Sequence, residues 1–246
     1  MKILYHIGRY YLFVAKVFKR PEKHKIFFSD FLKEIDKLGV NSLGIVFIIS
    51  IFMGAVITLQ TAYNIESPLI PDYLVGLTAR DSMILEFSST IVGLILAGKV
   101  GSNIASEIGA MRISEQIDAL EIMGINSASY LVLPKITAAM FINPFLNLLS
   151  IFIGLIGGYL ACLLTEAVPT ADFIDGLHYA FVPFYVAYSM IKTFIFAFII
   201  TSVPAYHGYY VKGGSLEVGR ASTRAVVYSS ILILLFNVIL TQMLLA

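Results

Sequence analysis

The sequence predicts an all-α polytopic membrane protein, and three observations support this fold class. The 246 residues are 58% hydrophobic and only 13% charged, whereas soluble domains carry about 25% charged residues. Several apolar stretches are long enough to cross a bilayer as helices. Basic residues are unevenly divided among the segments that separate these stretches. We therefore expect five transmembrane helices, an N-terminal interfacial helix and a cytoplasmic amphipathic helix between spans two and three.

The N-terminal region, residues 1–40, differs in composition from the membrane domain expected at residues 41–246. It holds nine of the seventeen Lys and Arg residues. Apolar side chains recur at helical spacing, which is typical of a helix resting on a membrane surface. These side chains are Ile3, Leu4, Ile7, Tyr11, Val14 and Phe18. A second short helix, at about residues 29–38, should lead to the first span.

Spans one and two differ in how clearly the sequence marks them. Residues 42–63 are uncharged and long enough to cross about 30 Å of hydrocarbon. Span two, at about residues 73–98, has a clean apolar window only at residues 88–97. We expect a broken or partly re-entrant element there, buried by other protein segments. The loop before it is marked by Glu66, Pro68, Pro71 and Asp72, and charges inside it are Arg80, Asp81 and Glu86.

A polar stretch follows span two and predicts a helix over about residues 101–124. Its apolar side chains have spacings of four, three and three, which places them on one helical face. They are Ile113, Ile117, Leu120 and Met123. Such a helix lies on lipid or docks into a soluble partner, and the spacing does not choose between the two.

The remaining spans are expected at about residues 130–165, 179–203 and 223–245, with an acidic loop at 165–178 and a polar loop at 204–222. In span three, Pro134 and Lys135 are expected at the entrance, and Pro144 is a candidate for a kink. Small residues recur every fourth position in span three, which lets another helix approach closely. They are Ser150, Gly154, Gly158 and Cys162. We favour packing within the chain over contact with a second copy.

The basic residues predict the orientation. Residues 1–41, 99–135 and 205–224 hold fifteen of the seventeen Lys and Arg residues. Cytoplasmic loops of membrane proteins carry an excess of these residues. The N-terminus and the polar helix should therefore face the cytoplasm, and the C-terminus should face the periplasm.

No pattern in the chain indicates catalysis, a metal site, a bound cofactor or nucleic-acid binding. Residues 93–99 match the first seven positions of a phosphate-binding loop, but Val100 stands where Ser or Thr would reach magnesium. The four histidines lack the spacing of metal ligands; they are His6, His24, His178 and His207. Energy for any transport must therefore come from a partner or a gradient.

Two ionisable residues inside the predicted spans are candidates for a polar site. A charge at the centre of a bilayer costs at least ~2.5–3.5 kcal/mol, so it usually faces protein or water and has a partner. Glu86 and Lys192 would lie at similar depth. We hypothesise that they approach each other at the end of a cavity, while separate partners for each remain the alternative. Apolar side chains of span one that could touch lipid tails, or only the ordinary bilayer, are Phe52, Met53, Val56 and Leu59.

Residues 98–135 carry a more specific pattern. The run GKVGSNIASEIGAMRISEQIDALEIMGI, followed by Tyr130–Lys135, closely resembles the signature of the MlaE (YrbE-like) permease family. These permeases are the membrane subunits of ABC transporters that work with MCE-domain proteins on lipids. Residues 219–227 resemble the family's segment entering the last span. Glu86 lacks the family's basic neighbour, and Lys99 replaces the usual Arg, which keeps the charge but loses the bidentate fork.

The resemblance implies a homodimer of permeases in the inner membrane. Each copy would bind one cytoplasmic ABC ATPase, where ATP and magnesium would be held, and an MCE-domain protein would sit on the outer face. Phospholipid would occupy a cavity lined by spans one and five, with Glu86 and Lys192 in its polar part. The polar helix would be the coupling helix, with Glu107, Arg112, Glu115, Gln116, Asp118 and Glu121 as candidates for coupling to the ATPase.

Two other functions remain open on the sequence. A gradient-driven secondary transporter could use Glu86 as a proton site, although the chain shows no internal repeat of the kind such folds carry. A membrane scaffold could recruit a cytoplasmic protein through residues 98–125. The scaffold predicts that nothing depends on Glu86 or Lys192.

Overall fold

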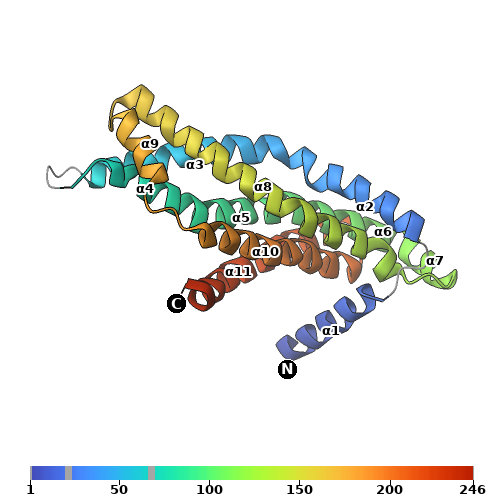
Figure 1. Ribbon diagram of the computed structural model, residues 1–246. Helices are drawn as coiled ribbons and strands as arrows, with labels where there is room; N and C mark the ends of the chain where they lie inside the picture. Colours follow the sequence, from blue (N-terminus) through green and yellow to red (C-terminus); the bar gives the residue numbers. More distant parts are fainter. Residues whose placement is uncertain (1, 20–23, 66–69, 246) are drawn as a thin grey trace. The chain divides into compact units, whose positions relative to one another are not determined.

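The computed structural model describes residues 2–19, 24–65 and 70–245, and over these residues it is built of helices without a β-strand (Figure 1). Five helical segments are long and apolar enough to cross a membrane, which confirms the predicted class. They are Lys25–Asn64, Tyr73–Ile113, Ser127–Thr165, Pro183–Tyr209 and Ser215–Leu245. Glu66 and Pro68, predicted in a loop, lie outside the described residues, as do Arg20 and Lys23 of the basic N-terminal region.

The chain divides into two compact units. The first unit comprises Met1–Asn41, Leu94–Ile142 and Ile195–Ile239. The second unit comprises Ser42–Gly93, Asn143–Phe194 and Leu240–Ala246. Each unit therefore takes segments from several of the long helices.

The N-terminal region forms two helices, α1 (Lys2–Val17) and α2 (His24–Leu38). On α1, Phe13 and Val17 are buried, whereas Leu4, Ile7 and Tyr11 are exposed. The helix thus has an apolar outer face, as expected of an interfacial helix. Helix α2 begins five residues before its predicted start. A single 3₁₀ turn, η1 (Val40–Ser42), leads to α3 (Leu43–Asn64), which agrees with the predicted first span.

The sequence predicts a broken or partly re-entrant span two, and this prediction is wrong. The span is one continuous helical run from Tyr73 to Ile113. Two π-helical segments interrupt its α-helical hydrogen bonding. The run consists of α4 (Tyr73–Ser82), η2 (Met83–Ile91), α5 (Val92–Leu96), η3 (Ala97–Gly101) and α6 (Ser102–Ile113). Because π-helix keeps the backbone hydrogen-bonded within the segment, it changes the helical register without breaking the span. Residues 93–99 are helical and form no phosphate-binding loop.

The predicted helix at 101–124 is wrong as a single element. Helix α6 ends at Ile113, and a separate helix, α7 (Gln116–Ile122), begins after Glu115. Glu115 has a left-handed backbone with φ of 60°. The turn breaks the predicted apolar stripe, so that Ile117 is buried whereas Met123 is exposed.

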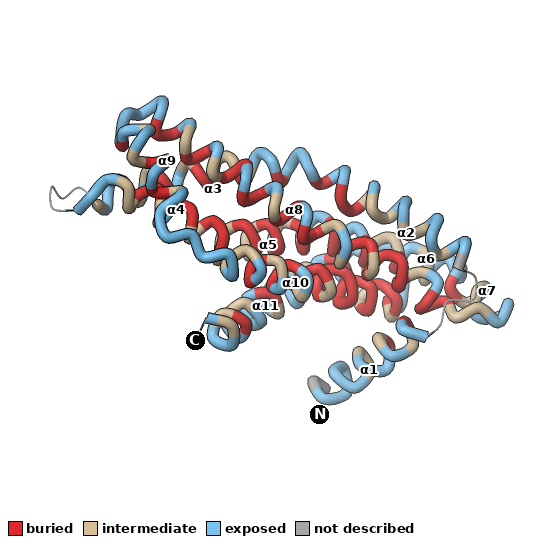
Figure 2. The backbone as a smooth tube through the Cα atoms, in the orientation of Figure 1, coloured by how far each residue is buried: buried red, intermediate tan, exposed pale blue. Residues whose placement is uncertain are grey.

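Helix α8 (Ser127–Thr165) begins three residues before its predicted start. Pro134 and Lys135 therefore lie inside the helix rather than at its entrance, and the helix also continues through Pro144. The predicted small-residue face packs within the chain, against α3. A methyl group placed on Gly54 would lie 1.8 Å from the carbonyl oxygen of Gly154, so the two backbones touch. Figure 2 shows buried and exposed residues alternating along α8.

The last third of the chain is more helical than predicted. The expected acidic loop contains α9 (Thr170–His178), which packs beside α4 (Figure 1). Helices α10 (Pro183–Tyr209) and α11 (Ser215–Leu245) leave only residues 210–214 of the predicted 204–222 loop. Hydropathy marks the apolar part of a helix but not the polar turns at its ends, and this explains the shifted boundaries.

Candidate functional site

An ion pair joins the two ionisable residues that the sequence placed inside spans. Lys192 Nζ on α10 lies 3.0 Å from Glu86 Oε1 on η2, and both residues belong to the second unit. The side chain of Lys192 is completely buried. Its ammonium also donates to the carbonyl of Leu85 at 3.0 Å and to the hydroxyl of Tyr188 at 3.1 Å. The predicted approach of Glu86 to Lys192 is therefore confirmed as a contact.

Glu86 is the part of this cluster that remains accessible. Its side chain is 39% exposed. Oε1 accepts a hydrogen bond from Thr241 at 3.2 Å, and Tyr188 lies 3.5 Å away. Thr90, one turn along η2, donates to Oε2 at 3.3 Å. The cluster thus neutralises a buried cation and offers a partly open carboxylate.

Sequence reasoning missed Tyr188 and Thr241. Tyr188 precedes Lys192 by four residues, and helical residues four apart share a face, so this partner could have been found. Thr241 lies on α11 and is brought to Glu86 only by the folding of the second unit. No pattern in the sequence indicates that contact.

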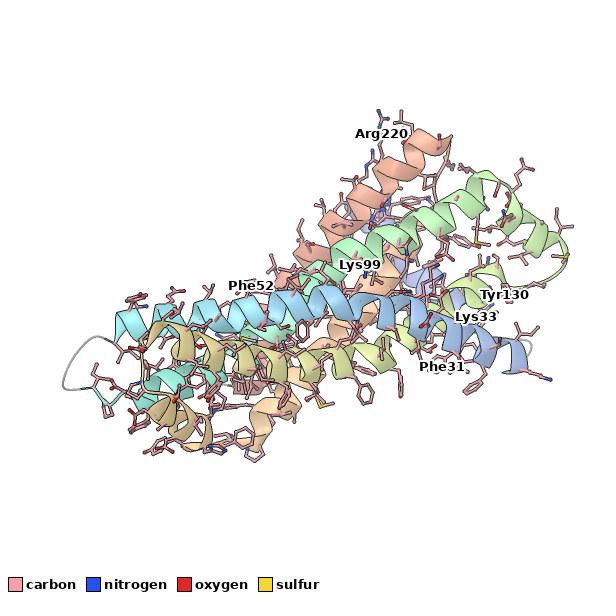
Figure 3. The ribbon with its side chains drawn as sticks, turned by 90° about the horizontal axis from the view of Figure 1, so that it is seen from above. Phe31, Lys33, Phe52, Lys99, Tyr130 and Arg220 are labelled. Atoms are coloured by element: carbon pink, nitrogen blue, oxygen red, sulfur yellow. The ribbon has the colours of Figure 1, made fainter. Side chains whose placement is uncertain are left out.

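The four candidates for lipid contact on α3 differ in exposure. Phe52 and Val56 are exposed, and Figure 3 labels Phe52 on this helix. Met53 instead packs against a buried cluster that includes Ile57 and Met83. Leu59 is half-buried. The second unit has a shallow apolar depression along α3 and α8, and none of the four candidates lines it. Its lining residues are Leu43, Gly44, Phe47, Leu149, Phe152, Ile153 and Ile156.

Glu107, a predicted coupling residue, belongs to a network of four charges in the first unit. It lies 2.5 Å from Lys37 on α2 and 3.0 Å from Lys135 on α8. Lys135 also lies 2.5 Å from Glu34 on α2, and only 6% of its side chain is exposed. The network therefore ties α2, α6 and α8 together.

Glu121, another predicted coupling residue, is the acceptor at a junction of four segments. It accepts hydrogen bonds from Lys16 at 2.8 Å, Tyr209 at 2.9 Å and Ser127 at 3.0 Å. The bonds from Lys16 and then Tyr209 lower the pKa of Glu121 to about 2, against a smaller opposing effect of burial. Glu121 is therefore ionised at neutral pH.

The surface around α7 is less charged than the sequence predicts, because two of the predicted coupling residues pair with each other and two apolar side chains are exposed. Arg112 and Asp118 pair at 2.7 Å across the α6–α7 turn, so their charges are matched within the chain. Glu115 and Gln116 are exposed. Ile122 and Met123, which follow at the C-terminal end, are 87% and 65% exposed. We call Ile122 and Met123 the apolar tip; sequence reasoning missed Ile122 and assigned Met123 to the apolar stripe.

Within the described residues, no group of three or more His, Cys, Asp or Glu side chains could hold a metal ion. The buried Cys162 is a free thiol.

Comparison with known proteins finds one family. The family described as Permease MlaE matches residues 31–243. A probable ABC transporter permease protein of Rickettsia bellii is 34% identical over 99% of this chain and 93% of its own length. The intermembrane phospholipid transport system permease protein MlaE of Haemophilus influenzae is 29% identical over 85% of this chain and 80% of its own length.

A plant protein is also similar. Protein TRIGALACTOSYLDIACYLGLYCEROL 1, chloroplastic, of Arabidopsis thaliana is 29% identical over 94% of this chain and 66% of its own length. The family model thus reaches from the first to the last of the five long helical segments, and the Rickettsia relative covers nearly the whole chain.

Proposed function

Because the chain belongs to the MlaE family of ABC transporter permeases, we propose that it moves phospholipid across or out of the inner membrane, driven by a separate ATPase subunit. The Haemophilus relative is named for intermembrane phospholipid transport. The single observation that carries the substrate class is the Glu86–Lys192 ion pair between two membrane-spanning helical segments of the second unit. A phospholipid has the same combination of a charged head group and apolar tails.

The second unit suits such an amphipathic substrate. Its carboxylate at Glu86 is partly open, and exposed apolar side chains such as Phe52 and Val56 are present on α3 of the same unit. An ionised group that is paired and hydrogen-bonded persists in an apolar setting, whereas an isolated one would be expelled or neutralised. We infer that the ion pair supplies the polar part of a lipid site.

A partner must supply the energy. Residues 93–99, the segment nearest to a nucleotide motif, are helical, and the family consists of transporter components rather than enzymes. We propose that a cytoplasmic ABC ATPase, with its ATP and magnesium, docks on α7. The exposed residues Glu115, Gln116, Ile122 and Met123 would make the contact. Arg112, Asp118 and Glu121 would shape α7 through their partners within the chain, and Glu107 would hold α6 in place through Lys37 and Lys135.

The remaining assembly follows the same proposal. The C-terminal half of α11 is largely exposed (Figure 2), with apolar side chains that include Ile231, Leu235, Val238 and Met243. This surface suits a second copy of the permease. The basic residues favour a cytoplasmic location for the N-terminus and α7, with the C-terminus on the periplasmic side. We propose, from the family resemblance, that an MCE-domain protein binds on that periplasmic side.

The family assignment favours this mechanism over the two alternatives. A proton-driven carrier would use Glu86 as a proton site, but Glu86 is already paired with the buried Lys192 at 3.0 Å. A scaffold would not need a buried ion pair at all. The carrier predicts transport without the ATPase subunit, and the scaffold, which moves no substrate, predicts no lipid transport at all.

Docking on α7 can be tested by replacing Ile122 with Asp. The substitution puts a charge at the centre of the proposed contact, so the affinity for the ATPase subunit should fall at least about tenfold. A matched control is Ile174→Asp, which changes an exposed isoleucine on α9. Affinity is measured by co-purification and by titration of the ATPase onto the detergent-solubilised permease. Equal binding of both variants and the unmodified chain would remove α7 as the docking element.

A further inference from the structure

Helix α1 is held against the end of α10 by its buried face. Phe13 is buried and lies 5.1–5.9 Å, ring to ring, from Tyr206, Tyr209 and Tyr210. The guanidinium of Arg9 stacks 3.7 Å above the ring of Tyr210. Aromatic and cation–π contacts of this kind stabilise beyond the area that they bury. One face of α1 therefore packs against specific side chains of the first unit, while its other face is apolar and exposed.

The C-terminal end of α1 is tied to the segment around α7. Lys16 Nζ donates to Glu121, which precedes the apolar tip by one residue. The backbone carbonyl of Lys16 accepts from the side chain of Asn126 at 2.9 Å. The carbonyl of Lys19 accepts from the hydroxyl of Ser129 at 2.9 Å. Three contacts thus connect residues 16–19 with residues 121–129.

Helix α7 is an element whose orientation must be set by such contacts. It has only seven residues and lies between two positions with left-handed backbone, Glu115 with φ of 60° and Gly124 with φ of 79°. An isolated helix of this length is unstable in water. Ile117 anchors one side by burial, and Arg112 pairs with Asp118 near the start. Glu121 is the acceptor that holds the other end.

We propose that α1 is a strap that positions α7, with Lys16 acting through Glu121 on the apolar tip. The strap holds Ile122 and Met123 in the orientation that the ATPase subunit engages. Lys16 and Glu121 are thus positioning residues that set how much lipid moves for each ATP hydrolysed. This inference rests on the proposed function, and it gives α1 a role beyond that of a membrane anchor.

The local consequence can be measured without the ATPase. Amide hydrogen exchange is recorded for residues 114–124 of the full chain in detergent. Lys16→Met should raise exchange in this segment about threefold or more, because α7 loses one of its few restraints. The control is Lys33→Met, which removes an equal charge from a lysine on α2 that pairs with Asp30 of its own helix (Figure 3). Unchanged exchange in Lys16→Met would overturn the strap.

The functional consequence is tested by charge reversal. Lys16→Glu and Glu121→Lys are each assembled with the ATPase in proteoliposomes, and lipid transfer and ATP hydrolysis are measured together. Each single variant should lower the ratio of lipid moved to ATP hydrolysed about three- to tenfold. The double variant restores opposite charges and should recover to within about twofold of the unmodified chain.

The outcomes separate the strap from the proposed function. Absence of ATP-dependent lipid transfer by the unmodified chain would remove the proposed function, while hydrogen exchange would still decide on the strap. Normal transfer ratios in both single variants, or a double variant no better than the singles, would overturn the role of the Lys16–Glu121 pair. Loss of ATPase binding by Lys33→Glu would also contradict it, because the ion-pair partner of that lysine is Asp30 of its own helix.

Discussion

The two units of the chain use charge in opposite ways. In the second unit, one completely buried lysine, Lys192, is matched by a single carboxylate, Glu86. In the first unit, lysines from the N-terminal helices meet carboxylates near the surface, as Lys16 meets Glu121 with 41% of each side chain exposed. The first arrangement joins two long membrane-spanning helical segments, whereas the second joins the N-terminal helix α1 to the short helix α7.

The difference in burial predicts a difference in role. Removing one partner of a buried ion pair leaves an uncompensated charge, which costs ~3–5 kcal/mol. Removing one partner of an exposed pair costs about 0–1 kcal/mol because water replaces it. The Glu86–Lys192 pair should therefore decide whether the second unit folds and holds its substrate, while an exposed pair such as Lys16–Glu121 should mainly decide where α7 points.

The largest effect is expected at the buried pair. Glu86→Gln leaves the ammonium of Lys192 without a countercharge and should lower the free energy of unfolding by ~3 kcal/mol. Lys192→Met should cost less, because the remaining carboxylate is 39% exposed and can be hydrated. Circular dichroism suits the measurement because the chain has no tryptophan. If the double variant loses as much free energy of unfolding as the two single variants together, the two residues are uncoupled. That result would contradict the assignment of Glu86 and Lys192 as a stabilising ion pair.

An intermediate effect is expected at Lys135, the most buried charge of the first unit. Lys135→Met removes the partner of Glu34 and one of the two partners of Glu107. Leaving the nearly buried carboxylate of Glu34 without this donor should cost ~2 kcal/mol. Lys33→Met, on the exposed side of α2, is the control and should change the stability by less than about 0.5 kcal/mol. Equal losses of stability in Lys135→Met and Lys33→Met would show that burial does not determine how much a charged side chain contributes to stability.

The smallest effect is expected at Glu121 and depends on pH. Its pKa is lowered to about 2 from 4.5, so its contribution to stability is complete above pH 4.5 and is lost as the pH falls toward 2. The contribution should stay below about 1 kcal/mol because the pair is exposed. Comparing unfolding of the unmodified chain with that of Glu121→Gln between pH 5 and pH 3 measures it. A difference that is constant over this range would contradict the assigned interaction.

The sequence predicted the long helices and the buried pair for physical reasons that are easy to state. Hydropathy over twenty residues marks a span, and the cost of an intramembrane charge indicates that Glu86 and Lys192 need partners. The small residues Ser150 and Gly154 predicted close packing, and the contact with α3 confirms it. These features depend on composition and local spacing alone.

The parts that escaped prediction depend on tertiary contacts. The sequence marks Glu107 and Glu121 as candidates for coupling to the ATPase, but their partners Lys37 and Lys16 lie 70 and 105 residues away in the sequence. The left-handed turn at Glu115 has no glycine to mark it, so one helix was predicted where there are two. The exposure of Ile122 was missed for the same reason, because Ile122 lies at the end of the second helix and would lie inside a single unbroken one.

ATP-dependent lipid transfer by the reconstituted permease tests the central claim most directly. The chain is assembled with its ATPase in liposomes that contain a fluorescent phospholipid, and transfer to an added MCE-domain acceptor is followed with ATP and with a non-hydrolysable analogue. We expect transfer that requires ATP hydrolysis and is reduced at least about tenfold by Ile122→Asp. Transfer that proceeds without the ATPase, or that follows a proton gradient instead, would contradict the account.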